Sequence, residues 1–125
     1  MQEWWAFPNR AVVLDEKHIH DGDTLRAYVD TGFYHVATRV SLRLDGIDTP
    51  ELNSPDPAER VKGLAARERL RMLLPVNTPF TIETRKFPGD RYGRWLARVY
   101  TPDGRMVNDL LVAEGHARLY SGGKK

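Results

Sequence analysis

The 125-residue sequence contains no cysteine, which excludes disulfide bonds and thiolate metal sites. It also contains no apolar run near the ~18 residues that a membrane-spanning helix needs, so we expect no association with a membrane. The opening stretch MQEWWAFPNR lacks the basic and apolar segments of a signal peptide. We therefore expect a cytoplasmic protein, for which a bacterial or phage source would be suitable.

The sequence also has little net charge. There are 19 Lys and Arg residues against 17 Asp and Glu residues, a formal net charge of +2. A total this small does not indicate a nucleic-acid partner, so only the placement of the charges can. The length and the 41% of hydrophobic residues fit one folded domain. We predict a single domain over residues 1–125, with its core in about 11–120, that acts as a monomer.

Apolar residues that alternate with polar ones predict five strands. The clearest is HVATRVSLRL, in which apolar side chains occupy every second position over the second half. A turn is expected at Asp30-Thr31-Gly32, between the second strand and this one. The predicted strands cover residues 11–14, 24–30, 35–44, 79–87 and 94–100.

Two helices are predicted from apolar residues at helical spacing. The first covers residues 59–74 and is expected to end before Pro75. The second begins near Val107, and Gly115 is placed to cap its end. The resulting order is β-β-β-α-β-β-α. This order predicts an α+β fold, a β-barrel with α-helices in which five strands form a Greek-key barrel of the OB type.

Four acidic residues lie in or beside the predicted loops at strand ends: Asp21, Asp23, Asp48 and Glu51. Hard oxygen ligands in a chain without cysteine suit Ca²⁺ or Mg²⁺. Asp48 and Glu51 are three residues apart across a turn that Pro50 stiffens, so their side chains can converge on one point. An EF-hand is excluded, because the later ligand positions and the closing glutamate of its loop are missing.

Basic residues accompany these acids: Arg43, Arg85, Lys86, Arg91, Arg94 and Arg98. Arginine presents a planar fork that binds phosphate oxygens in pairs. Carboxylates, a divalent cation and arginines together predict chemistry at a phosphodiester bond. Each motif alone also has a structural interpretation. DGDT is a common turn sequence, Arg43 can form an ion pair with Asp45 or Asp48, and residues 85–94 can be a solvated loop.

Four stretches together resemble the staphylococcal-nuclease-like, or thermonuclease, family: DGDT (21–24), RLDGIDTPE (43–51), DRYGRWLA (90–97) and VNDLLVAEGHARLY (107–120). The resemblance implies an OB-fold barrel that hydrolyses DNA and RNA with Ca²⁺ and leaves 3′-phosphate ends. The chain ends at SGGKK, where the family usually continues through another helix. We therefore expect the family's usual C-terminal helix to be lacking.

The resemblance also implies roles for individual residues. Asp23 and Asp48 are similar to the carboxylate ligands of Ca²⁺, and the backbone carbonyl of Thr49 to a third ligand. Asp21 resembles an acid outside the direct ligand set. Glu51 is similar to the residue that orients or deprotonates the attacking water.

Other positions correspond to the residues that contact the substrate. Arg43 and Arg94 resemble the two arginines that clamp the scissile phosphate, and Tyr92 resembles a tyrosine near the nucleotide-binding pocket. We add Arg91 and Arg85 as substrate-binding residues, because they belong to the same basic group.

These observations predict a calcium-dependent endonuclease, a phosphodiesterase that acts on DNA and RNA and prefers single strands. The alternative is a catalytically silent OB-fold module that binds single-stranded nucleic acid. The acidic residues favour the enzyme, because negative charge beside a phosphate opposes simple binding.

Overall fold

The computed structural model describes residues 9–30, 38–86, 90 and 93–120 of the chain. The predicted turn residues Thr31 and Gly32 lie outside this part, as do residues 121–125 at the chain end. The elements in chain order are β1 (Asn9–Val12), the 3₁₀ helix η1 (Glu16–His18), β2 (Ile19–Asp21), β3 (Thr24–Val29), β4 (Thr38–Leu44), β5 (Ile47–Asp48), α1 (Pro57–Leu73), β6 (Phe80–Lys86), β7 (Trp95–Tyr100), α2 (Val107–Ala113) and β8 (Arg118–Leu119).

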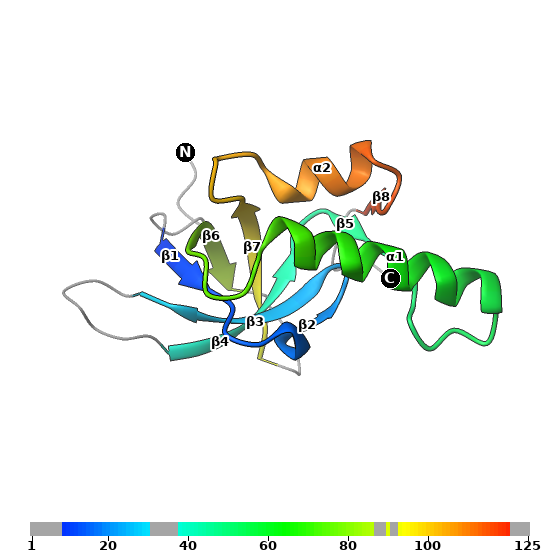
Figure 1. Ribbon diagram of the computed structural model, residues 1–125, viewed down its shortest axis with the longest axis horizontal. Coiled ribbons are helices and arrows are strands. Elements are labelled where there is room, and N and C mark those ends of the chain that lie inside the picture. The colour runs from blue at the N-terminus through cyan, green and yellow to red at the C-terminus, as the bar shows by residue number, and fades with distance from the viewer. Residues whose placement is uncertain (1–8, 31–37, 87–89, 91–92, 121–125) are drawn as a thin grey trace.

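Five strands form a closed barrel in the order β1-β6-β7-β4-β3, and pairing between β1 and β3 closes it (Figure 1). Neighbouring strands are antiparallel except β4 and β7, which run parallel. The predicted five-stranded barrel of the OB type is confirmed, and so is the order of its main elements. The first strand, at 9–12, begins and ends two residues earlier than the predicted 11–14.

Three further strands, β2, β5 and β8, were not predicted. β2 extends the sheet as the partner of β3, and β5 pairs with β8 in a separate two-stranded sheet. Each has only two or three residues, which is too short for an alternating pattern to be recognised. The β5–β8 pair joins the DGIDTPE stretch to the end of the described chain.

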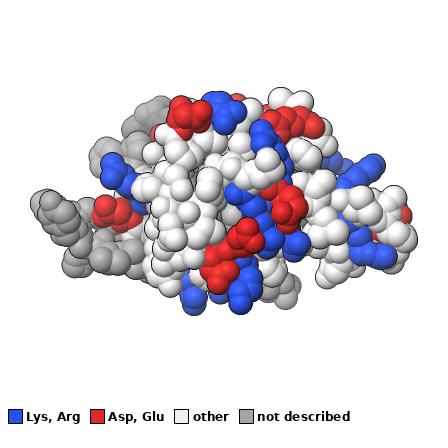
Figure 2. Space-filling model, viewed as in Figure 1, with Lys and Arg blue, Asp and Glu red and all other residues white. Residues whose placement is uncertain are grey.

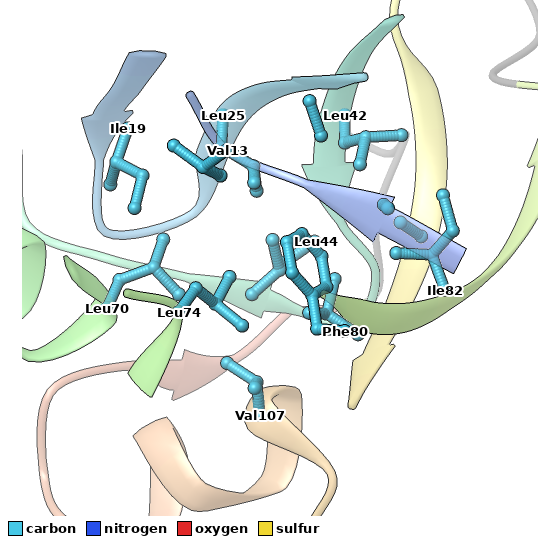
Figure 3. Packing of buried hydrophobic residues seen from close by; sticks show 14 of the residues in the cluster. Val13, Ile19, Leu25, Leu42, Leu44, Leu70, Leu74, Phe80, Ile82 and Val107 are labelled. Carbon is cyan, nitrogen blue, oxygen red and sulfur yellow. The ribbon is translucent and has the colours of Figure 1, made fainter. Parts of the chain in front are cut away.

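The core fills the barrel and the space between the barrel and the two helices. Figure 3 shows Leu70 and Leu74, from the end of α1, in one cluster with Leu44, Phe80 and Val107. All five side chains are fully or almost fully buried. Burying an aliphatic or aromatic side chain of this size contributes about 1.5–3 kcal/mol to folding. The apolar face predicted for α1 is therefore the face that packs on the barrel.

Local sequence signals fix the start of α1 and the end of α2. α1 begins at Pro57, two residues before the predicted start, because the Asp56 carboxylate caps it and accepts the Ala58 N–H at 3.0 Å. α2 ends at Ala113 and is followed by its C-cap Glu114 and by Gly115, whose φ of +82° is readily adopted by glycine. Its N–H donates to the Val112 carbonyl at 3.0 Å, as expected for the predicted C-cap.

Helix α1 packs closely against two turns. A Cβ atom on Gly63 would be 2.8 Å from the Pro50 carbonyl oxygen. A Cβ atom on Gly22 would be 2.8 Å from both the Ala66 Cβ and the Thr49 Cγ2. Glycine at these two positions thus permits a contact that any other residue would push apart.

The N-terminal half of α1 extends beyond the barrel (Figure 1). The segment 49–56 that leads into it lies at the same end of the molecule. None of the described helices is long and apolar enough to cross a membrane.

Candidate active site

Asp23 lies in the short connection between β2 and β3 and is 6% exposed. Its carboxylate accepts the Thr49 backbone N–H at 3.0 Å and the Thr24 hydroxyl at 3.1 Å. Its own N–H donates to the Asp21 carboxylate at 3.2 Å. The DGDT stretch is therefore more than a surface turn, because it joins the Asp48–Thr49 segment of the next acidic motif.

Arg43 on β4 connects both acidic motifs. Its Nη1 donates to the carbonyls of Leu44 and Ile47, each at 2.9 Å, and lies 3.4 Å from the Asp23 Oδ2. Its Nη2 lies 3.8 Å from the Asp48 Oδ1. The structural ion pair considered from the sequence therefore exists with Asp48. It also includes Asp23, which the spacing along the chain did not suggest.

The Asp23 carboxyl group is held in an unfavourable environment for its charge. Burial raises its pKa to about 6, and the Arg43 guanidinium opposes the rise. Asp21 adds to the rise through a hydrogen bond and through its charge, whereas the Thr49 N–H lowers the pKa. Arg43 therefore compensates only part of the cost of the buried anion. Additional positive charge beside Asp23 would be stabilising.

A pH dependence of stability follows for the metal-free protein. Because the folded pKa of Asp23, about 6, exceeds its ordinary value of 3.8, the folded state binds the proton more tightly than the unfolded state. Stability should thus rise as the pH falls from about 7 towards 4, by on the order of 1–3 kcal/mol. Melting temperatures measured in a chelator over this range would show the rise.

The matched variants for this prediction are Asp23→Asn, which should flatten this part of the profile, and Asp109→Asn, which should not. Asp109 is an exposed residue on α2. A profile of the same shape in wild type and Asp23→Asn would contradict the assignment to Asp23.

Asp48, Thr49 and Glu51 line one open groove, with a volume of about 700 Å³. Lys62 of α1 and the segment 115–118 also line this groove. Glu51 is exposed, and its backbone N–H donates to the Glu59 Oε2 at 3.1 Å, which ties the turn to α1. We name this space the Glu51 groove.

Two charged groups hold Asp48 at the edge of the Glu51 groove. The Arg118 Nη2 lies 3.1 Å from its Oδ2, opposite the side on which Arg43 approaches Oδ1. The pairing of β5 with β8 sets Arg118 directly across from Asp48. The sequence stretch HARLY gave no signal for this contact, because it depends on a pairing across 70 residues.

The side chain of Asn108 makes a second set of contacts that the sequence did not indicate. It is 2% exposed and lies on the barrel face of α2. Its Oδ1 accepts the Val99 N–H at 3.0 Å, and its Nδ2 donates to the carbonyls of Asp45 and Ala97 at 2.9 and 3.1 Å. It thereby joins α2 to the turn between β4 and β5. The only hint of this role in the sequence is that a polar residue, Asn108, directly follows the apolar Val107.

The remaining basic candidates occupy different positions. Arg94, directly before β7, forms a bidentate pair with Asp90, with Nη2–Oδ1 and Nε–Oδ2 distances of 2.8 and 3.3 Å. The Arg85 Nη2 on β6 lies 3.9 Å from the Asp45 Oδ1. Arg91 and Tyr92 lie outside the described residues. The structure therefore joins Arg43 to the acidic motifs directly, while the substrate-binding roles of the other four residues stay predictions.

The chemistry of the donors fits a hard divalent cation. Asp23 Oδ2 and Asp48 Oδ1 approach the same guanidinium through its Nη1 and Nη2, so the two carboxylates lie near each other. In the described part of the chain, no group of three or more His, Asp or Glu residues is arranged to hold a metal ion. The convergence of Glu51 with Asp48 on one point is therefore not shown, and a cation held by two carboxylates would need carbonyl and water ligands.

On the face seen in Figure 1, Lys and Arg side chains lie next to Asp and Glu side chains and do not form one basic area (Figure 2). On this face, positive charge therefore occurs in local arrangements beside acidic residues and not as a broad positive field. Arg43 between Asp23 and Asp48 is such an arrangement.

Residues 41–125 match the family model described as "Staphylococcal nuclease homologue". The chain belongs to the staphylococcal nuclease family. It is 36% identical over 102 residues to the thermonuclease of Staphylococcus intermedius, covering 82% of this chain and 56% of that relative. It is 33% identical over 103 residues to an uncharacterized endonuclease of Escherichia coli O157:H7, covering 80% and 56%. The chain thus spans about half the length of the curated relatives it matches.

The match to the staphylococcal nuclease family begins after the DGDT motif. It includes Arg43, Asp48, Glu51 and Arg94, but Asp23 lies before residue 41. The structure supplies the missing connection, because the Asp23 carboxylate binds the Thr49 backbone inside the matched region. The family resemblance expected from the sequence is confirmed.

Proposed function

We propose that this chain is a nuclease domain that uses Ca²⁺ to hydrolyse phosphodiester bonds of DNA and RNA, acts as a monomer and prefers single strands. The observation that carries the proposal is the position of Arg43 between Asp23 and Asp48, beside the groove that Glu51 lines. This arrangement combines groups for a phosphate, a cation and a water molecule. The names of the relatives reported above, a thermonuclease and an endonuclease, support the same activity.

The cation would be held by Asp23, Asp48 and the backbone carbonyl of Thr49. When bound, Ca²⁺ supplies positive charge that neutralises the phosphate and favours attack by water. Two carboxylates and a carbonyl leave room for several waters, which suits the flexible coordination of Ca²⁺ better than the strict octahedron of Mg²⁺.

Glu51 accepts a proton from the water that attacks phosphorus. As the new P–O bond forms, the bond to the 5′ oxygen breaks, and that oxygen takes a proton from solvent. The products are a 3′-phosphate end and a 5′-hydroxyl end. The exposure of Glu51 in an open groove supports this role, because a strand can reach its carboxylate without a change in the core.

Arg43 and Arg94 donate to the phosphate oxygens, on which negative charge grows in the transition state. In Arg43, the two carbonyl contacts use Nη1. Nη2 lies 3.8 Å from Asp48, which is beyond hydrogen-bond distance. The Nη2 side of the fork is therefore the side we assign to the phosphate.

The activity is expected to need Ca²⁺. Single-stranded DNA and RNA should be cut in Ca²⁺, cut poorly in Mg²⁺ and left intact in a chelator, as measured by gel assay with end-group analysis. Equal rates in the two metals, or full activity in the chelator, would contradict the calcium site. If the protein bound single-stranded DNA and RNA but cut neither in any metal, this result would support the silent binding module.

A further inference from the structure

A second groove, with a volume of about 510 Å³, meets the Glu51 groove at Glu51, which lines both. Its basic lining residues are Lys17 of η1 and Arg67 and Arg71 of α1, and its acidic ones are Asp21 and Glu51. We name it the Arg67 groove. It lies between α1, the β2 segment and the residues that follow Glu51.

Arg67 and Arg71 are one helical turn apart, so their side chains share a face of α1. Both are largely covered, with exposed side-chain fractions of 26% and 17%. Arg71 is fixed by donating to the Ile19 carbonyl at 3.2 Å and to the Glu68 Oε2 at 3.1 Å. The Arg71 guanidinium is thus held at the groove before any ligand arrives, which lowers the cost of ordering it.

The same two arginines have unused hydrogen-bonding capacity. Within the described residues, the Nε atoms of Arg67 and Arg71 are buried and have no hydrogen-bond partner. These Nε atoms are enclosed by protein, so a ligand in the groove would meet the parts of the two side chains that stay exposed. The nearest anion to Arg67 is the Glu68 Oε2, 3.7 Å from its Nε, on a side chain that is 58% exposed. An exposed carboxylate of this kind is a weak partner that a phosphate can displace.

The charge of the Arg67 groove favours a single anion over a metal ion. Three cationic side chains in its lining exceed the two carboxylates, and one of those, Glu51, also belongs to the other groove. Arginine binds phosphate oxygens through its planar fork. His20, also in the lining, adds a further possible donor.

We propose that the Arg67 groove binds a backbone phosphate of the nucleic-acid strand next to the phosphate that is cleaved. This inference rests on the proposed nuclease function. A strand whose scissile phosphate lies near Arg43 and Glu51 continues past Glu51, and the Arg67 groove begins at that residue. Lys17, Arg67 and Arg71 are positioning residues there, since they hold the strand and do not touch the reacting atoms.

Binding without turnover gives the first test. A fluorescent single-stranded oligonucleotide long enough to span both grooves is titrated in chelator at several salt concentrations. Arg67→Gln and Lys17→Gln should each reduce the slope of log K against log salt, by up to about 0.7 for one phosphate contact. Arg105→Gln, an exposed arginine that lines neither groove, should leave the slope unchanged.

Lys17 is exposed, so Lys17→Gln should keep the fold even if an arginine variant does not, and melting temperatures establish this. An unchanged salt slope in both folded variants would overturn the inference, even if the wild-type protein cuts nucleic acid.

Kinetics in Ca²⁺ give the second test. On the long oligonucleotide, Arg67→Gln and Lys17→Gln should raise KM several-fold with kcat unchanged, and on a dinucleotide they should match the wild type. If KM rose equally on both substrates, these residues would act through general electrostatics, and the proposed phosphate site in the Arg67 groove would be wrong. If the wild-type protein cuts neither substrate, the proposed function fails. The salt slopes still show whether the Arg67 groove binds a phosphate.

Discussion

Replacing Glu51 with glutamine is expected to lower kcat by roughly 10²–10⁴-fold, the usual contribution of a positioned general base. Glutamine keeps the size and one acceptor oxygen but removes the negative charge and the basicity. Substrate binding should hold or tighten slightly, because one negative charge beside the phosphate is lost. Single-turnover rates in Ca²⁺, with Ca²⁺ affinity and melting temperature measured on the same protein, check the prediction.

Two comparisons make this result specific. Ca²⁺ affinity should change less in Glu51→Gln than in Asp48→Asn, since we assign Glu51 to water and Asp48 to the metal. Glu59→Gln changes a second acid in the same groove but keeps a carbonyl oxygen that can accept the Glu51 N–H, so kcat should stay within a few-fold of wild type in the folded protein. Unchanged kcat in a folded Glu51→Gln protein would remove Glu51 from the mechanism.

Arg43→Lys is expected to lower kcat by roughly 10²–10³-fold, because lysine keeps the charge but loses the planar fork that meets the phosphate. Arg43→Ala should cause at least the same loss and should also lower the melting temperature. The alanine leaves the buried Asp23 carboxylate without its nearest cation and the carbonyls of Leu44 and Ile47 without their donor. The lysine variant is therefore the one that separates catalysis from folding.

Arg98→Ala is the matched control for these variants. Arg98 lies 3.9 Å from Glu83 on the neighbouring strand β6, and we place it off the active site. Its loss should change substrate binding slightly and in a salt-dependent way, with little effect on kcat. If Arg98→Ala were as damaging as Arg43→Lys, the assignment of Arg43 to the scissile phosphate would be wrong.

The barrel could be predicted because its strands are long enough to show their period. Leu42 and Leu44 are completely buried and Arg43 between them is not, as the alternation in HVATRVSLRL required. The pattern could not show β5 or β8, since two residues carry no period. These short strands nevertheless bring Arg118 to Asp48 and so shape the edge of the site.

The candidate site was predictable in part, for a related reason. The acids stood out because several occur in short stretches at strand ends, whereas Asn108 is a single polar residue within a helix. The bond from Thr49 to Asp23 spans 26 residues, and no local spacing encodes it. The family resemblance suggested that Asp23 and Thr49 cooperate, and the structure supplied the contact through which they meet.

Gly63 in α1 and Gly22 in the turn packed against it give the helix a role in the stability of the site. Gly22 precedes Asp23 and lies against the Ala66 side chain of α1, and Gly63 of α1 lies against the backbone of Pro50 and Glu51, so both acidic turns pack on the same helix. A transient detachment of the helix would therefore release both turns at once while the barrel strands stayed paired. The catalytically competent fraction would then depend on the interface between α1 and the barrel. The free energy needed to open this interface can be smaller than the free energy of unfolding of the whole domain.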